Sequence, residues 1–289
     1  MYRKNNGIYV LEEDWDNLII LDACRYDFFK KILKNYPLEG NLEFRISRGS
    51  HTKQFLIENF KRSIRDDIVY ITANPHVDVH LTRNFYKIIS VWKDGWSDKF
   101  HTVLPNVMYQ RSLEAIKKYP NKKMIIHFMQ PHYPYIDENH ELKALQYLRE
   151  SILYNKNKPL QKIKKLEQKE EFWALYSYYV YKILDIETHI RGYWKNLQIT
   201  LPYVEKLVSL LSGTTIITAD HGEAFGEYIH PIFPVKYYGH RDNVRIPILV
   251  KVPWFIIKKE RKIPTQDVES REKDNILKTI KELRKQEKF

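Results

Sequence analysis

Short apolar runs alternate with helical patterns along most of the chain. The apolar runs predict buried strands at residues 18–21, 68–72, 124–128, 214–218 and 246–252. Apolar residues at helical spacing predict helices at residues 24–35, 107–118, 166–194 and 202–211. Gly213 follows the last of these and can adopt the left-handed conformation that ends a helix. Strands that alternate with helices predict an α/β fold with a mostly parallel sheet covered on both faces.

The composition changes sharply near the C-terminus. All predicted strands lie within residues 1–256, and a chain of 289 residues is long enough for one large α/β domain. Residues 257–289 are mostly charged, with a narrow apolar stripe at helical spacing. We therefore predict one domain over residues 1–256, followed by a charged C-terminal helix or tail over residues 257–289.

The formal net charge of +12 favours anionic partners such as phosphate or sulfate esters, acidic glycans or anionic lipids. A lysine-rich surface that only aids solubility explains the charge equally well. No basic run with interleaved aromatic residues is long enough to predict nucleic-acid binding. Cys24 is the single cysteine, so no intrachain disulfide can form. With no signal-peptide pattern and no run of the roughly 18–20 apolar residues that span a membrane, we expect a cytoplasmic protein.

Two of the predicted strands end in metal-ligand residues. Asp22 follows the first strand, and Asp220-His221 follows the strand at residues 214–218. The carboxyl ends of parallel strands meet at the edge where open α/β sheets bind ligands. The alternative is that Asp22 only caps the following helix. The presence of Asp220-His221 at the end of another strand makes this alternative weaker. The set predicts a divalent ion, with Mn²⁺ or Zn²⁺ favoured by the histidine and Mg²⁺ or Ca²⁺ left open.

These motifs resemble the alkaline phosphatase superfamily, and its sulfatase-like branch most of all. The resemblance rests on Asp22 in LDACRYD, Asp220-His221 in TADHGE, and Gly239-His240 followed by Arg245-Ile246-Pro247. It runs from about residue 16 to 254. It implies an alkaline-phosphatase-like three-layer α/β/α sandwich that acts on phosphate or sulfate esters.

The resemblance also implies a nucleophile in a loop that leads into a helix. Residues 46–53, ISRGSHTK, match that placement. The Cys/Ser-x-Pro-x-Arg motif that sulfatases convert to formylglycine is absent. Phosphotransferase relatives use an unmodified threonine, so Thr52 is the predicted nucleophile and an additional metal ligand. Ser50 is the alternative nucleophile, and a helix cap is the non-catalytic alternative for either residue.

Several further residues are candidates for substrate contacts. By resemblance, His132 in PHYPY contacts the transferred group or protonates the leaving oxygen, and His240 contacts the anion or the metal. Arg25 is a candidate guanidinium clamp on the substrate, with a helix-surface arginine as an equal alternative. His127 lies inside a predicted strand and is expected to be structural. Asn74, in Asn74-Pro75-His76 after the strand at residues 68–72, could line the pocket, although a structural role is favoured.

The leading hypothesis is metal-dependent hydrolysis or transfer of phosphate or sulfate esters through Thr52. One divalent ion is expected, because no clear Asp-x-x-x-His pattern supplies a second set of ligands. A second ion is left open. The substrate would be an anionic ester, for example a cell-surface glycan or lipid precursor. The alternative is a non-catalytic anion- or glycan-binding or assembly protein on a decayed sulfatase-like fold. No Gly-x-Gly-x-x-Gly follows the first strand, which argues against a nucleotide-binding Rossmann protein.

Overall fold

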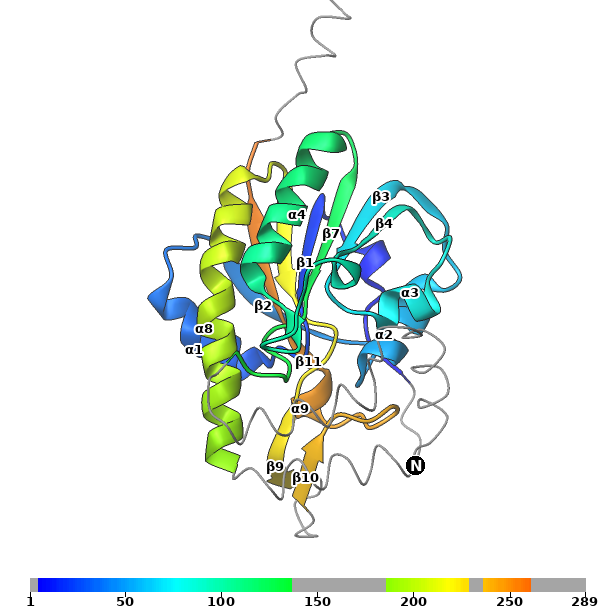
Figure 1. The fold of residues 1–289 in the computed structure, drawn as a ribbon. Helices are drawn as coiled ribbons and strands as arrows, with labels where there is room; N and C mark the ends of the chain where they lie inside the picture. The colour runs from blue at the N-terminus through cyan, green and yellow to red at the C-terminus, as the bar shows by residue number, and fades with distance from the viewer. Residues whose placement is uncertain (1–4, 137–185, 229–235, 261–289) are drawn as a thin grey trace, which may run out of the picture.

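A seven-stranded sheet forms the middle of the molecule (Figure 1). The structure is a computed structural model that describes residues 5–136, 186–228 and 236–260. The strand order is β2-β11-β8-β1-β7-β3-β4. These strands are β1 (Asn17–Leu21), β2 (Asn41–Ile46), β3 (Arg65–Thr72), β4 (Phe85–Ser90), β7 (Lys123–Phe128), β8 (Thr214–Thr218) and β11 (Lys251–Lys258). β11 is antiparallel to both of its neighbours, β2 and β8, and the other four pairs are parallel, which confirms the predicted α/β class with a mostly parallel sheet.

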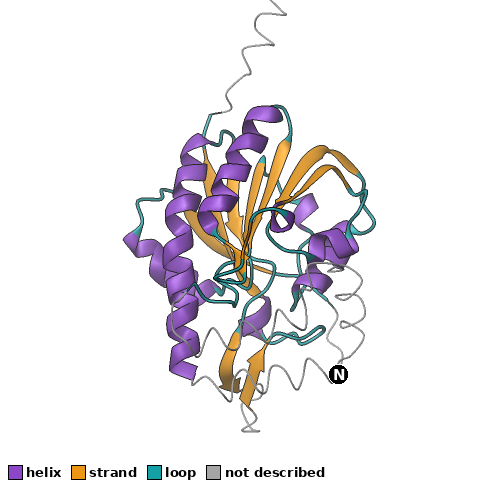
Figure 2. Ribbon diagram, viewed as in Figure 1, coloured by secondary structure: helices purple, strands orange, loops and turns teal. Residues whose placement is uncertain are grey.

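Helices cover both faces of the sheet, as Figure 2 shows by colour. One face carries α1 (Tyr26–Ile32), α4 (Pro105–Lys118) and α8 (Ile186–Leu210), and the other carries α2 (Thr52–Phe60) and α3 (His76–His80). Ile19 and Leu21 of β1 pack in the core beneath α1, α4 and α8. Leu18 and Ile20 of the same strand pack in the core on the opposite face, beneath α2 and α3. Because each central strand is buried on both sides, it reads as a continuous apolar run. The predicted three-layer architecture is confirmed.

Smaller elements gather where the parallel strands end. They include the antiparallel hairpin of β9 (Ala224–Tyr228) and β10 (Lys236–Gly239), and α9 (Pro247–Val250) (Figure 1). Elsewhere lie β5 (Trp96–Ser97), β6 (Thr102–Val103), and the 3₁₀ turns η1 (Val10–Glu12), η2 (Leu33–Asn35) and η3 (Val91–Lys93). In the part of the chain that the structure describes, no helix combines the length and apolarity needed to cross a membrane.

The helix α8 differs from the prediction, which placed two separate helices at residues 166–194 and 202–211. It runs without interruption from Ile186 to Leu210 and contains Pro202. A proline in a helix lacks the N–H that would bind the carbonyl four residues earlier, here that of Gln198. The hydroxyl of Tyr36 donates to this carbonyl at 3.0 Å and replaces the missing donor. The part of the first predicted helix before residue 186 lies outside the described residues.

The strand predicted at residues 246–252 is also wrong in its limits. Pro247 begins the short helix α9, and β11 begins only at Lys251. The strand then continues through Pro253, which pairs with β2, while pairing with β8 begins at Trp254. Its last residue is Lys258, beyond the predicted domain limit at 256, and residues 261–289 lie outside the described residues. The division into domain and tail stays a prediction.

Candidate metal centre

Four of the predicted site residues meet at the carboxyl ends of the parallel strands. Asp22 follows β1, Asp220 and His221 follow β8, and Thr52 is the first residue of α2. Thr52 Oγ1 donates to Asp220 Oδ2 at 2.7 Å. His221 Nε2 lies 3.3 Å from the same oxygen and 3.6 Å from Asp22 Oδ1. All four residues are buried, and their ligand atoms come from three separate segments of the chain.

The backbone around Asp220 holds its carboxylate in place. Asp220 Oδ1 accepts from the N–H groups of Ala23 at 3.0 Å and His221 at 2.9 Å. Ala23 has a φ of 59°, a left-handed conformation that is uncommon for a residue other than glycine. Position 222 requires glycine because the backbone of Ile248 lies close to it: a Cβ there would lie 2.1 Å from the carbonyl oxygen of Ile248. The local backbone is therefore shaped to present this carboxylate.

The hydrogen bonds at the site indicate which ring nitrogen of His221 carries the proton. His221 Nδ1 lies 2.8 Å from the carbonyl oxygen of Gly222, so Nδ1 carries the proton and Nε2 presents a lone pair. That lone pair faces Asp220, Asp22 and also Thr52 Oγ1, 3.2 Å away, whose proton already points to Asp220. Electron-rich atoms this close together repel one another unless a cation lies between them. The residues present therefore fit a divalent ion.

Burial and neighbouring charges set the ionisation of these groups. Burial alone would raise the pKa of Asp220, but His221, His127 and the hydrogen bonds from Ala23 and Thr52 hold this pKa below its ordinary value. Burial lowers the pKa of His221, although Asp220 opposes the shift. An ionised carboxylate beside a neutral imidazole is the state in which both side chains can bind a metal ion.

Two residues that were expected to be structural lie at the same site. Asn74 Nδ2 donates to Asp22 Oδ2 at 2.5 Å and so orients this carboxylate. His127 Nε2 lies 3.8 Å from the same oxygen and has no hydrogen-bond partner among the described residues. Burial lowers the pKa of His127 to about 4, and one ligand atom each from Asp22, His127 and Asp220 lie within 4.8 Å of one another. His127 is therefore a further candidate ligand.

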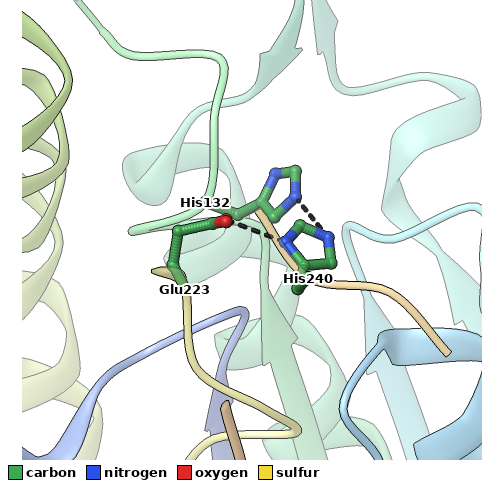
Figure 3. A group of neighbouring side chains, drawn as sticks. All are labelled: His132, Glu223 and His240. Atoms are coloured by element: carbon green, nitrogen blue, oxygen red, sulfur yellow. Dashed lines mark hydrogen bonds and ion pairs between the residues drawn. The ribbon is translucent and has the colours of Figure 1, made fainter. Parts of the chain in front are cut away.

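A second group of possible ligands lies next to the first and consists of His132, Glu223 and His240 (Figure 3). His240 Nδ1 lies 2.8 Å from Glu223 Oε2, and His132 Nδ1 contacts the carbonyl oxygen of Tyr133. Both Nδ1 atoms therefore act as donors, and the two Nε2 atoms face each other at 3.3 Å. A proton shared between the rings, or a cation, satisfies this contact. The His240 ring also lies 4.4 Å from that of His221, centroid to centroid, which joins the two groups.

The helix α8 supports both groups from one side. Tyr193 donates to the carbonyl of Ala23 at 2.7 Å and accepts from the N–H of Arg25 at 2.8 Å, which fixes the turn after β1. One turn further, the buried Asn196 binds the loop that contains His132. Its Nδ2 donates to the carbonyls of His132 at 3.1 Å and Pro134 at 3.0 Å, and its Oδ1 accepts from a further N–H of the loop.

The loop before Thr52 is tied to the segment that follows His240. Ser50 Oγ donates to the carbonyl of Arg241 at 2.6 Å and accepts from the N–H of Val244 at 3.2 Å. Arg245 donates to the carbonyl oxygens of Ser47 and Arg48 at 2.9 and 3.2 Å. Two hydroxyls of this loop thus differ in their surroundings, because that of Ser50 joins backbone segments whereas that of Thr52 faces Asp220.

Arg25 lies in a different environment from the one expected of a substrate clamp. Its guanidinium forms ion pairs with Asp27 and Glu227 and also donates to the carbonyl of Glu223. It packs over the rings of Phe28 and Phe225, with 6% of the residue exposed. Two carboxylates therefore already balance its charge. This arrangement does not favour the clamp role and instead favours Arg25 as the link between α1 and β9.

Cys24 is expected to be dispensable. The residue is fully buried, and burial raises the pKa of its thiol well above the ordinary value, so the thiol stays protonated and packs as an apolar group. The Cys24→Ala variant should keep most of the wild-type turnover, with a loss of stability of about 1 kcal/mol. Intact-mass spectrometry should find an unmodified cysteine in the wild type. A formylglycine mass at this position, or loss of activity without unfolding, would contradict the expectation.

Comparison with known proteins adds structural similarity at low sequence identity. No family model matches the chain, and the search of curated proteins found no match. The chain is similar to the integral membrane lipooligosaccharide phosphoethanolamine transferase A from Neisseria meningitidis, at 12% identity and a TM-score of 0.49 over 83% of this chain. It spans about half of that protein, 47% of its length.

Two further solved structures are similar to the chain at comparably low sequence identity. The C-terminal periplasmic domain of EcEptC from Escherichia coli, in complex with Zn, matches at 13% identity and a TM-score of 0.48, over 85% of this chain and 72% of that domain. A protein in the alkaline phosphatase superfamily from Vibrio parahaemolyticus matches at 12% identity and a TM-score of 0.40, over 85% and 60%. The function proposed below rests on the geometry of the site.

Proposed function

We propose that the chain is a metal-dependent enzyme that transfers or hydrolyses anionic esters through a covalent intermediate on Thr52. One observation carries the proposal: the Thr52 hydroxyl is the one that meets Asp220 and His221 at the candidate metal centre. Asp22, Asp220, His221 and Thr52 would hold the ion, with His127 within reach. A divalent ion bound there lowers the pKa of the threonine hydroxyl and offsets the charge of the transferred group.

The hydrogen bond from Thr52 to Asp220 orients the attacking hydroxyl. For a phosphate ester, Thr52 Oγ1 forms a bond to phosphorus while the bond from phosphorus to the leaving oxygen breaks. Asp220 Oδ2 accepts from this hydroxyl at 2.7 Å, and the threonine proton would pass to solvent when a bound ion lowers the pKa of the hydroxyl. Ser50 is less suited to attack, because its hydroxyl joins two backbone segments. These contacts favour Thr52 over the alternative nucleophile.

The pair of His132 and His240 supplies the second proton. The leaving oxygen takes the proton shared between the two Nε2 atoms and departs as an alcohol. In the second half of the reaction, water or an acceptor hydroxyl attacks phosphorus and returns a proton to the pair. Thr52 Oγ1 then leaves phosphorus and takes up a proton from solvent. Every proton that is released in one step is thus taken up in another.

The support of the His132 loop gives a test of this acid. Asn196→Asp keeps the shape of the side chain but removes the amide donors to the carbonyls of His132 and Pro134. We expect kcat for alkyl esters, which need an acid, to fall by about 100-fold, because small misplacements of a catalytic group cost this much. Aryl esters with good leaving groups should lose far less. Gln198→Glu, at an exposed position of the same helix, is the control. Equal losses for both ester types would contradict the role.

The residues of the site define the substrate class only broadly. A cation, a hydroxyl nucleophile and an acid suit both phosphate and sulfate esters, and a cell-surface glycan or lipid precursor stays the proposed natural substrate. Mn²⁺ and Zn²⁺ are the proposed ions, because imidazole ligands suit them better than Ca²⁺. A cytoplasmic location likewise stays a prediction. The alternative, a protein that binds anions without catalysis, predicts ligand binding with no turnover.

The decisive experiment is a panel of esters with controlled metal content. The protein is treated with a chelator and then given Mn²⁺, Zn²⁺, Mg²⁺ or Ca²⁺ with aryl phosphate mono- and diesters, a phosphonate ester, a sulfate ester and a phosphoethanolamine ester. We expect turnover of at least one ester, loss of it after chelation and recovery with one ion. Metal-independent turnover, or none under any condition, would overturn the proposal.

A further inference from the structure

His51 lies directly before the proposed nucleophile, and its ring is part of the candidate metal centre. It is the N-cap of α2, which begins at Thr52. The ring is parallel to that of His221, with centroids 6.0 Å apart and an interplanar angle of 2°. The rings of His240 and His76 lie 5.3 and 5.6 Å away. His51 therefore lies among the side chains that would surround a group bound to Thr52.

The cap hydrogen bond determines which ring nitrogen carries the proton. His51 Nδ1 accepts from the backbone N–H of Lys53 at 3.2 Å. The neutral ring therefore carries its proton on Nε2, the atom on the far side of the ring from the start of α2. Asp242 Oδ1 lies 3.6 Å from Nδ1, on the capped side. Among the described residues, Nε2 makes no hydrogen bond.

The candidate metal ligands offer acceptors rather than donors. Asp22, Asp220 and the Nε2 lone pair of His221 all offer electron pairs, which suits a cation but not the non-bridging oxygens of a phosphoryl or sulfuryl group. Those oxygens gain charge in the transition state and are stabilised by donors already in position. Resting on the function proposed above, we propose that His51 Nε2–H donates a hydrogen bond to a non-bridging oxygen of the group transferred to Thr52.

Two substitutions separate this role from the capping role. His51→Asn keeps an acceptor close to the backbone and is among the best N-caps, but it removes the distal donor. His51→Gln places an amide donor near the position of Nε2 and weakens the cap. Three quantities are measured on the full chain: the midpoint of thermal unfolding, the affinity for Mn²⁺ or Zn²⁺, and the affinity of the metal-loaded protein for inorganic phosphate. The value of kcat is added for the best ester, and His80→Asn on α3 controls for the loss of a nearby imidazole.

We expect His51→Asn to unfold at the wild-type temperature and to bind the metal normally, with phosphate affinity lowered about tenfold and kcat about 100-fold, as for other donors to a developing anion. His51→Gln should regain part of both losses despite a lower unfolding temperature. Wild-type phosphate affinity and kcat in His51→Asn would overturn the inference and leave the proposed function intact. If the metal-loaded wild type neither binds phosphate nor turns over any ester, the proposed function fails and this inference fails with it.

Discussion

Replacing Thr52 by alanine is expected to lower kcat by at least about 10³-fold, because removal of an attacking group leaves only the contributions of binding and charge stabilisation. The metal should stay bound, since Asp22, Asp220 and His221 are unchanged. The fold should persist too, because the lost methyl and hydroxyl groups belong to a small side chain at the start of α2. The variant is measured by steady-state kinetics with the best ester and by metal content after dialysis.

Two matched variants make the result specific to Thr52. Thr52→Ser keeps a hydroxyl that can face Asp220 and should retain a measurable part of the turnover. Ser50→Ala removes the hydroxyl that joins the loop to Arg241 and Val244, and should lower activity moderately by loosening the loop. Mass spectrometry after rapid quenching should find a phosphoryl or sulfuryl group on Thr52. Normal turnover in Thr52→Ala together with loss in Ser50→Ala would move the nucleophile to Ser50, and normal turnover in both would exclude the covalent route.

The strand ends of this fold can be predicted from local sequence. A run such as residues 214–218 is buried on both faces, so its apolar pattern and the polar residues that follow show both the strand and its end. Because parallel strands end at one edge of a sheet, the local pattern alone predicts that Asp22 and Asp220 lie together. The structure brings Thr52 and His221 to the same place.

Contacts between distant segments cannot be predicted from such local patterns. Asn74 meets Asp22 because β3 and β1 both lie beside β7, and strand order is not visible in the pattern of a single strand. For Arg25 the local pattern leaves a substrate clamp and a helix-surface arginine as equal alternatives, because its partner Glu227 lies 202 positions later in the chain. Pro202 likewise suggests the start of a helix. The helix continues through it because Tyr36 donates to the carbonyl of Gln198, 162 positions away in the chain. The local sequence pattern predicts helices and strands, whereas the roles of Asn74, Arg25 and Tyr36 depend on contacts with residues that are distant in the chain.

Replacing Asp220 by alanine is expected to remove most of the bound metal, with an affinity loss of at least about 100-fold. Loss of a residue that only supports a ligand costs 10–100-fold, and Asp220 is itself a proposed ligand. Its carboxylate also accepts from Ala23, His221 and Thr52, so the alanine variant loses positioning as well as charge. Metal affinity is measured by titration calorimetry, and metal content by elemental analysis.

Asp220→Asn separates these two effects. An asparagine oxygen at the Oδ1 position can still accept from Ala23 and His221, while the negative charge is gone. The contacts that hold the pKa of Asp220 below its ordinary value stabilise its carboxylate in the folded protein, and a neutral amide loses this contribution. We therefore expect the metal-free Asn variant to unfold below the temperature of the metal-free wild type. Added metal should raise the unfolding temperature of the wild type but not of the variant, since only the wild type gains binding energy in the folded state. If metal stabilises both proteins equally, or if metal-free Asp220→Ala keeps full activity, the ion does not bind through Asp220 and the centre proposed here is wrong.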